Sequence, residues 1–375
     1  MPADGGEALQ ITRCDGDCLK PVPLADEQIA YTLLTRKNGR RHSSVYVCNP
    51  QGNDAHAITF GPGDYEAEAA LRSGRLLLSA RWPLTTEDTA GGGRTLYTIR
   101  PDGSELAALR DTSAQSDVLA HAAELPDGTI VFLESSAEDP NKTIGHLAWL
   151  RPGTLRAKEI VSAMAAYQSV ATMPGNVLLI SRRSSSSRDG LFNLYEIGFG
   201  GKEPASLLYA KPHFSSVQAV AALPHEAPPR YWSILHPNAQ TGRIVCLNAY
   251  LSQDVAGGRI KAAVARVRVL ALDENDQTFS LGQAPVEGDG SFYVSVPANK
   301  PIRFQLLDAQ GHILQEQRGW IWVRNGEDRG CLGCHESHSL APENRSPLAL
   351  QRLDMPLSLT GHIPSDPPPA GTENP

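Results

Sequence analysis

A repeat of about fifty residues runs through the first part of the sequence and constrains its fold more than any other feature. Five strand-like segments are each followed by a second one, and the centres of the second segments are 51, 52, 46 and 51 positions apart. These centres are Tyr46, Tyr97, Trp149, Tyr195 and Cys246. Paired strands at a period of 40–50 residues, with no helical segment between them, are typical of a β-propeller.

The predicted strands can be placed from their apolar residues and from the turns between them. The first strands of the repeats are expected at residues 29–34, 75–79, 129–133, 176–180 and 230–235, and the second strands at 44–48, 95–99, 146–150, 193–197 and 243–247. Turn residues such as Pro126-Asp127-Gly128 and Pro174-Gly175 precede two of the strands. We therefore predict about five propeller repeats over residues 20–250, with room for a sixth blade. A β-sandwich with coincidental spacing is the alternative.

The pattern changes after residue 250. Residues 262–272 alternate Val and Arg over most of their length, and residues 291–296 and 302–307 are short strand-like runs separated by tight turns. This predicts a small β-sandwich-like middle domain at 251–318. A segment at 319–353 follows, and residues 354–375 form a Pro-rich tail, while residues 1–19 precede the repeats.

The segment at 319–353 contains Cys331-Leu332-Gly333-Cys334-His335, the C-x-x-C-H signature of c-type haem attachment. Two thiols at this spacing reach the two vinyl groups of one porphyrin, and the adjacent imidazole reaches the iron. Cys331 and Cys334 are therefore the predicted haem anchors, and His335 is the predicted first axial ligand. The same Cys/His cluster could instead bind a structural zinc ion. Trp320 and Trp322, which would share one face of a strand, are either haem-wall residues or ordinary core residues.

The sequence leaves the second axial ligand open. The candidates near the motif are Met355 and His362, and the more distant ones are His42, His213, His225 and His236. His338 would share a helix face with His335, so it cannot reach the opposite side of the same iron. It is a candidate propionate partner, zinc ligand or surface histidine. If no second ligand exists, the open iron would bind small molecules, whereas a filled iron would only carry electrons.

Charge, hydropathy and cysteine use limit the compartment and the partners. A net charge of −7 argues against nucleic-acid binding, and no run of 18 apolar residues predicts a membrane span. Residues 1–17 lack the pattern of a signal peptide. Because haem c is normally attached after export, we still expect a periplasmic or extracytoplasmic location. Cys14 and Cys18 could form a disulfide there or be two thiols, and Cys48 and Cys246 are expected to be buried.

Several stretches of the C-terminal half resemble the hydrazine synthase alpha subunit family. They are residues 290–308, 319–324, 330–336 and 341–345, and the detailed likeness covers roughly residues 240–350. The resemblance implies a periplasmic-type propeller, a middle β domain and a haem c held by Cys331, Cys334 and His335. It also implies zinc near the haem and other subunits as partners.

The sequence also departs from that family. In hydrazine synthase a tyrosine just after the motif ligates the catalytic haem, but here no tyrosine follows Tyr293, and no second C-x-x-C-H is present. The sequence therefore favours a divergent member that does not form hydrazine. A hydrazine-synthase-like enzyme, which would need an open iron site and partner subunits, is a further alternative. The predicted fold is all-β, with a TolB/WD40-like β-propeller, a small β-sandwich domain and a short C-terminal haem c segment. The predicted function is electron transfer or small-molecule redox chemistry with a redox partner protein or other subunits, as a haem-dependent oxidoreductase if the iron is open. The alternative is a propeller interaction protein with structural zinc.

Overall fold

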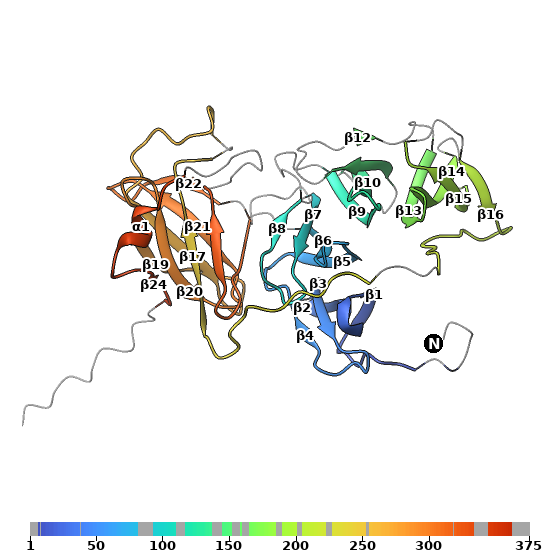
Figure 1. Ribbon diagram of the computed structural model, residues 1–375, viewed down its shortest axis with the longest axis horizontal. Helices are drawn as coiled ribbons and strands as arrows, with labels where there is room; N and C mark the ends of the chain where they lie inside the picture. Colours follow the sequence, from blue (N-terminus) through green and yellow to red (C-terminus); the bar gives the residue numbers. More distant parts are fainter. Residues whose placement is uncertain are drawn as a thin grey trace, which may run out of the picture. The chain divides into compact units, whose positions relative to one another are not determined.

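The computed structural model describes residues 7, 9–37, 39–81, 93–109, 117–136, 145–151, 158–159, 165–184, 190–200, 205–222, 227–252, 255–317, 319–333 and 344–361. The chain divides into two compact units, one up to residue 233 and one from residue 234 onward. Both units are built from β-strands (Figure 1). Among the described residues, no helix has the length and hydrophobicity needed to cross a membrane.

In the described residues of the first unit, the strands form four groups of four antiparallel strands. The groups are β1 (Asp17–Pro23), β2 (Ile29–Lys37), β3 (Arg40–Cys48) and β4 (His56–Ala57); β5 (Asp64–Ala70), β6 (Leu76–Arg81), β7 (Arg94–Ile99) and β8 (Ala107–Ala108); β9 (Asp117–Glu124), β10 (Ile130–Ser136), β11 (His146–Leu150) and β12 (Lys158–Glu159); and β13 (Ala165–Met173), β14 (Val177–Ser184), β15 (Asn193–Gly198) and β16 (Ser206–Tyr209). The second and third groups are joined into one sheet by a single parallel pair, Arg94 with Val118. A one-turn 3-10 helix, Ala25–Glu27, links β1 to β2.

These groups are propeller blades, and the packing of β10 shows why. Ile130 and Phe132 lie in one hydrophobic cluster with Leu77 and Leu96 of the preceding group. Val131 and Leu133, which point to the opposite face of the strand, lie in a second cluster with residues of the following group such as Leu178 and Ile180. A blade in the middle of a propeller buries both faces in this way. The innermost strands β1, β5, β9 and β13 also contact one another in succession.

The predicted strands and turns of the first four repeats agree with this structure. They correspond to β2, β6, β10 and β14 and to β3, β7, β11 and β15. At the predicted turn before β10, Gly128 has a φ of +83° and the amide of Thr129 donates to the carboxylate of Asp127 over 2.9 Å.

The fifth repeat of the sequence pattern is not a blade. Residues 230–235 contain no strand, and the 243–247 segment forms β17 (Thr241–Cys246) of the second unit. Residues 227–233 instead run in extended form along the turns of the first two blades. The carboxylate of Asp26 lies 2.7 Å from Arg230, and the hydroxyl of Ser233 donates to Asp102 over 2.7 Å. The apolar residues of this segment mimic a strand in the sequence, but the segment is bound through polar side chains.

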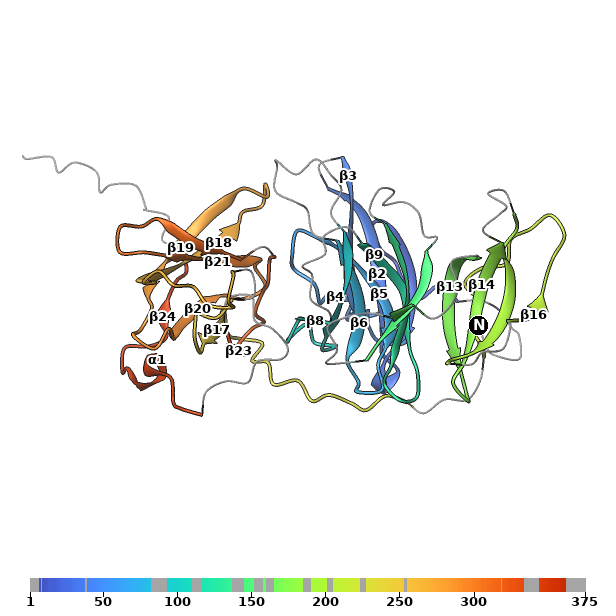
Figure 2. The ribbon, with the colours of Figure 1, turned by 90° about the horizontal axis from the view of Figure 1, so that it is seen from above.

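The second unit is a β-sandwich of two four-stranded sheets, which Figure 2 shows as two layers. One sheet has the order β23 (Asp328–Cys331), β17, β20 (Phe292–Pro297) and β24 (Leu357–Ser358). The other has the order β19 (Thr278–Pro285), β18 (Arg266–Leu272), β21 (Ile302–Leu307) and β22 (Ile313–Glu316), and a short helix α1 (Leu348–Gln351) precedes β24. The core between the sheets includes Ile244, Val267, Val294 and Leu306, each at most 1% exposed. The predicted β-sandwich is therefore confirmed, and β17 is part of it.

Candidate functional site

Cys331, the first cysteine of the C-x-x-C-H motif, is the last residue of β23 at the edge of the sandwich. This strand runs parallel to β17, with Asp328 opposite Arg243 and Cys331 opposite Cys246. Beyond the strand, the amide of Leu247 donates to the carbonyl of Cys331 over 2.9 Å. The amide of Asn248 donates to the carbonyl of Leu332 over 3.1 Å. The backbone that leads into the motif is therefore fixed along residues 246–248.

Gly333 is required at its position by close packing. A Cβ atom placed on Gly333 would lie 2.5 Å from the carbonyl oxygen of Leu251 and 2.8 Å from its Cβ. Gly330, on the other side of Cys331, has no atom within 4 Å of an added Cβ. The glycine between the two cysteines thus allows the motif to lie against residue 251, whereas Gly330 does not have this role.

The turn before β23 is held by a buried carboxylate. Glu327 is 1% exposed, and its side chain accepts a hydrogen bond of 2.7 Å from the amide of Arg324. Its backbone carbonyl accepts a bond of 2.8 Å from the amide of Arg243. The side chain of Arg243 in turn pairs with Asp328. These contacts fix the start of β23, so Cys331 projects from a defined position.

The two tryptophans that precede the motif are core residues in this structure. Trp320 is 7% exposed and Trp322 is 1% exposed, and the guanidinium carbon of Arg303 lies 4.9 Å from the ring centre of Trp320. The backbone carbonyl of Trp322 accepts a hydrogen bond from Arg329 over 3.3 Å. Both side chains are therefore occupied in the packing of the sandwich.

The structure places Met355 at the same end of the sheet as Cys331. Leu357 of β24 lies opposite Val294 of β20, and Phe292 of β20 lies opposite Cys246. Met355 lies two residues before β24, and β24 and β23 are the two opposite edge strands of this sheet. Met355 is half-buried. Met355 thus remains a candidate for the second iron ligand.

The other predicted ligands are distributed differently. The amide of His236 donates to the carbonyl of Asn325 over 2.9 Å, so the length of β23 separates His236 from Cys331. His42 and His213 lie in the first unit. Cys334, His335, His338, His362 and His225 lie outside the described residues. Within the described part of the chain, no three His, Cys, Asp or Glu side chains gather as a metal site, and zinc binding stays a prediction.

The donor chemistry of the motif fits haem c. Cys331 carries a thiol that is only partly buried, at the edge of the sandwich. Haem c needs two such thiols and one imidazole at this spacing. Cys331 is partly exposed and lies next to the apolar core of the sandwich, so a porphyrin attached to it could contact apolar side chains. The fit concerns Cys331 and its surroundings, because the structure does not describe the second anchor.

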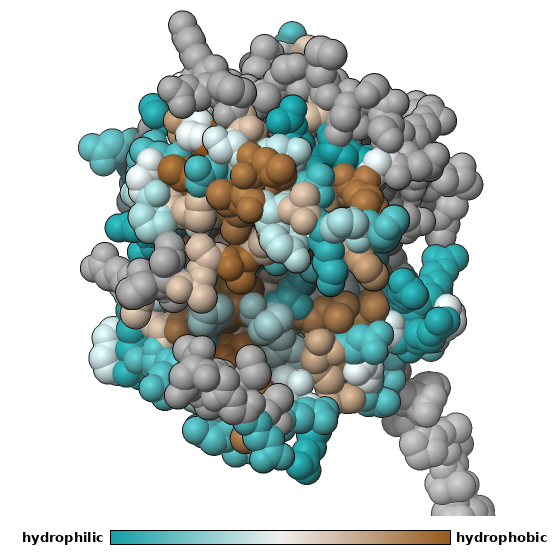
Figure 3. Space-filling view, turned by 90° about the vertical axis from the view of Figure 1, so that its right-hand side faces the viewer, coloured by the Kyte–Doolittle hydropathy of each residue, from teal (hydrophilic) through white to brown (hydrophobic). Residues whose placement is uncertain are grey.

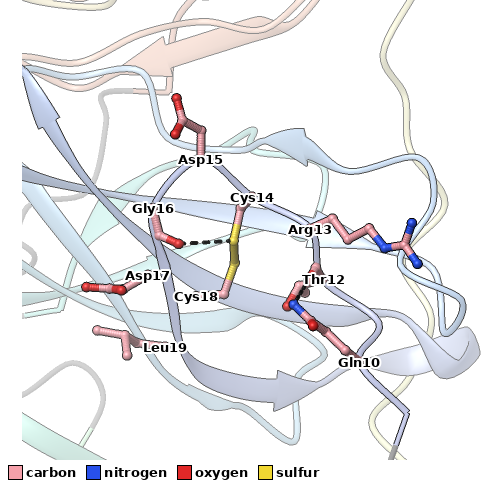
Figure 4. Close-up of a pocket in the computed structure, with 9 residues that line it drawn as sticks. All are labelled: Gln10, Thr12, Arg13, Cys14, Asp15, Gly16, Asp17, Cys18 and Leu19. Carbon is pink, nitrogen blue, oxygen red and sulfur yellow. Dashed lines mark hydrogen bonds between the residues drawn. A yellow bond between two sulfur atoms is a disulfide. The ribbon is translucent and has the colours of Figure 1, made fainter.

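Cys14 and Cys18 form a disulfide near the start of the chain. Figure 4 shows this bond at an open pocket formed by Gln10 and residues 12–19. Disulfides form and persist in oxidising compartments and are rare in the cytosol. Of the two alternatives open from the sequence, the disulfide is the one present in the structure.

A partly buried charge network between the first two blades was not predicted from the sequence. The ammonium of Lys20 on β1 lies 2.8 Å from Glu66 and 3.0 Å from Glu68, both on β5. The guanidinium of Arg94 on β7 lies 2.7 Å from Glu66. Glu68 is 3% exposed and accepts a hydrogen bond of 2.6 Å from the hydroxyl of Ser79. The network therefore connects two neighbouring blades, and its members come from four strands, β1, β5, β6 and β7.

Backbone bulges bring these groups together. The pairing of β1 with β2, β5 with β6 and β9 with β10 is interrupted at Lys20, Glu68 and His121, respectively. Lys20 and His121 have positive φ values of 49° and 51°. Such bulges re-aim side chains and are common next to functional sites. The signal available in the sequence was a charged or titratable residue, Lys20, Glu68 or His121, in each of the first three innermost strands at a spacing of about fifty residues.

The electrostatics of this network are strongly perturbed. Burial alone would raise the pKa of Glu66, but the attraction of Arg94 and Lys20 outweighs it and lowers the pKa to about 2. Burial opposes the charge on Lys20, but Glu68 and Glu66 raise its pKa overall. Burial lowers the pKa of His121, despite the nearby Glu68. The lowered pKa of Glu66 and the raised pKa of Lys20 both favour the charged forms, so their ion pair connects the first blade to the second near neutral pH.

An all-β chain with this architecture, a propeller followed by a sandwich that carries C-x-x-C-H at its edge, defines a narrow class of proteins. Residues 243–336 match the family model described as the hydrazine synthase alpha subunit middle domain. The solved structure of Kuenenia stuttgartiensis hydrazine synthase matches with a TM-score of 0.82 and 17% sequence identity, over 94% of this chain and 61% of that chain. The predicted resemblance to the hydrazine synthase alpha subunit family is thus confirmed, with the low identity of a divergent chain.

More distant matches are with isolated propellers. The β-propeller domain of the trilobed protease from Pyrococcus furiosus matches with a TM-score of 0.35 and 14% identity, over 53% of this chain and 54% of that chain. Oligogalacturonate lyase from Vibrio parahaemolyticus matches with a TM-score of 0.37 and 13% identity, over 54% of this chain and 57% of that chain. The search of curated proteins gave no match. The chain spans 61% of the hydrazine synthase chain that it matches.

Proposed function

We propose that this chain is an exported haem c protein on a hydrazine synthase alpha-like scaffold, in which Cys331 and Cys334 attach the haem and His335 ligates the iron. One observation carries the proposal: the backbone of the first anchor is fixed by β17 and residues 247–248, next to a glycine that no larger residue can replace without a shift. A haem attached there would supply a one-electron Fe(III)/Fe(II) couple. The chain contributes a fixed backbone at Cys331, and the apolar core of the sandwich packs against this residue.

The reaction class we propose is electron transfer or small-molecule redox chemistry, carried out with a redox partner or with further subunits. Hydrazine formation is not proposed, because residues 336–339, directly after the motif, contain no tyrosine. The Cys14–Cys18 disulfide supports export to the periplasm or another oxidising compartment. Met355 is the described candidate for the second ligand, because it precedes β24 at the end of the sheet where β23 reaches Cys331.

The test is a visible absorption spectrum of protein made with the haem c maturation machinery, first oxidised and then reduced with dithionite. A Soret band and a sharp α band after reduction are expected. A change on adding carbon monoxide would indicate an open iron, and no change would indicate a closed electron carrier. A colourless protein that loses order with a chelator would instead support the structural zinc alternative.

The anchor assignment has its own test. Cys334→Ala is expected to lower covalent haem below one per chain on a denaturing gel stained for haem, because only the thioether to Cys331 could then form. Cys48→Ser is the matched control, since Cys48 is a buried thiol of the first unit. Undiminished covalent haem in Cys334→Ala would show that the anchor is elsewhere.

A further inference from the structure

Cys246 lies directly beside the first haem-attachment cysteine. The parallel pairing of β17 with β23 sets Ile244 opposite Arg329, Val245 opposite Gly330 and Cys246 opposite Cys331. Each cysteine is the last residue of its strand. The sequence analysis treated Cys246 as a buried apolar residue 85 positions before the motif, and the juxtaposition comes only from the register.

Both thiols lie on the core side of the sheet. Residues paired across neighbouring strands point to the same face. Cys246 is 2% exposed within the sandwich core, and Cys331 packs against that same core cluster. Both residues carry thiols in this structure. Neighbouring strands are about 4.8 Å apart, which lies within the Cα separation of about 4.4–6.8 Å that a disulfide spans.

The backbone on both sides holds this arrangement. The hydrogen bonds from Leu247 to Cys331 and from Asn248 to Leu332 continue the pairing for two more residues. Gly333 then packs against Leu251. Cys331 therefore cannot move away from Cys246 without breaking these bonds, and the two sulfur atoms share one apolar end of the core.

We propose that Cys246 and Cys331 form a disulfide in the haem-free chain, and that this bond controls when haem can be attached. The pairing itself stands on the geometry, and its control over attachment rests on the proposed haem function. In the pairing step the two thiols lose two protons and two electrons. The electrons go to a protein or small-molecule disulfide, which is reduced to two thiols.

The two fates of Cys331 exclude each other. Thioether formation adds the S–H of Cys331 across a haem vinyl group, with no net oxidation of the sulfur. A sulfur bonded to Cys246 has no S–H to add. A dithiol reductant must therefore first cleave the disulfide, and after haem attachment Cys246 is left as a buried thiol against the haem edge of the core.

The experiment uses the full chain made in an oxidising compartment without haem maturation. Remaining thiols are alkylated, and the chain is digested with trypsin without reduction. Cleavage after Arg243, Arg259, Arg329 and Arg345 gives the peptides 244–259 and 330–345, which carry Cys246 and the motif cysteines. Mass spectrometry is expected to find these two peptides cross-linked, with fragmentation placing the bond at Cys331.

Two variants sharpen the result. Cys246→Ser is expected to abolish the cross-link and leave Cys331 available to alkylation, and Cys48→Ser is expected to leave the cross-link in place. Haem loading of peptide 330–345 is then followed by mass with and without a dithiol reductant. The wild-type chain is expected to need the reductant, and Cys246→Ser is expected to need it less.

The outcomes separate this inference from the proposed function. A Cys331–Cys334 bond without any link to Cys246, or full alkylation of all three thiols, would overturn the inference. So would identical reductant dependence in the wild type and Cys246→Ser. If the cross-link forms but peptide 330–345 never gains haem under any condition, the pairing stands and the proposed haem function fails.

Discussion

The propeller and the sandwich bury their polar groups in opposite ways. In the propeller, a network of charged side chains lies between the blades, and Glu68 within it is 3% exposed. In the sandwich, the core around Ile244 and Val294 is apolar, and the buried Glu327 lies in the turn before β23, where it accepts a backbone hydrogen bond. The propeller thus depends on charge pairs for part of its cohesion, whereas the sandwich uses buried polar groups to fix the segment that carries the motif.

The apolar surfaces of the two regions also differ. β16, the outer strand of the fourth blade, exposes Leu207, Leu208 and Tyr209 to 56%, 50% and 50%. Figure 3 shows apolar patches among polar ones on the side where β13–β16 lie in Figure 1. In the second unit, the exposed large apolar residues include Ile313, Leu350 and Leu353, which lie outside the central strands β17, β20, β18 and β21. Those four strands bury most of their apolar residues between two layers. Four predictions test how far the two regions are independent.

The largest effect is expected from Phe132→Ala in the propeller. Phe132 is fully buried among Leu77, Leu96 and Leu119, so its removal should cost about 3–5 kcal/mol. Hydrogen exchange read by mass spectrometry is expected to show lost protection in β9–β11 and unchanged protection in β17–β23. Phe292→Ala in the sandwich is the matched variant and should give the reverse pattern. Equal losses in both units from either variant would show that they unfold together.

The second effect is the acid sensitivity of the propeller. The pKa of Glu66 lies at about 2 in the folded chain, below its ordinary value of 4.5, because of Arg94 and Lys20. The stabilisation is therefore full above pH 4.5 and is lost as the pH falls toward 2. It amounts to at most about 3 kcal/mol. Glu66→Gln should remove this pH dependence from the unfolding of β1 and β5, and Glu196→Gln on β15 should not. An unchanged acid profile in Glu66→Gln would mean that other groups dominate.

The third effect concerns the motif. Gly333→Ala forces a Cβ against the backbone of Leu251, so it is expected to cost about 1–3 kcal/mol in the stability of the sandwich edge and to slow haem loading. Gly330→Ala adds a Cβ atom in open space, so it should change neither the stability of the sandwich edge nor the rate of haem loading. Hydrogen exchange at Leu247 and Asn248 measures the local loss directly. Equal behaviour of the two variants would contradict the close packing of the motif on residue 251.

The contrast between the regions also explains what could be predicted from the sequence. The repeat located the strands of four blades because each middle strand is buried on both faces and flanked by turns, as β10 shows. The prediction of a fifth blade was wrong because an extended apolar segment and a strand have similar sequences. What decides between them is pairing, and residues 227–233 are held by Asp26 and Asp102 instead.

The candidate functional residues also divide into those predictable from local sequence and those that depend on the fold. The motif cysteines and His335 could be found from spacing alone, because their chemistry is local in the sequence. The position of Cys246 beside Cys331 could not, because it depends on the register of two strands 85 residues apart. The Lys20–Glu66–Arg94 network could not either, because it depends on bulges that turn side chains toward neighbouring strands.

The smallest effect is expected from Arg230→Ala in the segment that runs under the blades. Arg230 and its partner Asp26 are 54% and 47% exposed, so solvent screens the pair and its loss should cost less than about 1 kcal/mol. Ser233→Ala, which removes the bond to Asp102, should have a similarly small effect. Exchange of residues 227–233 should nevertheless become faster in the double variant, while β17 keeps its protection. If β17 also lost protection, this segment would transmit the stability of the propeller to the sandwich, and the independence of the two regions would be refuted.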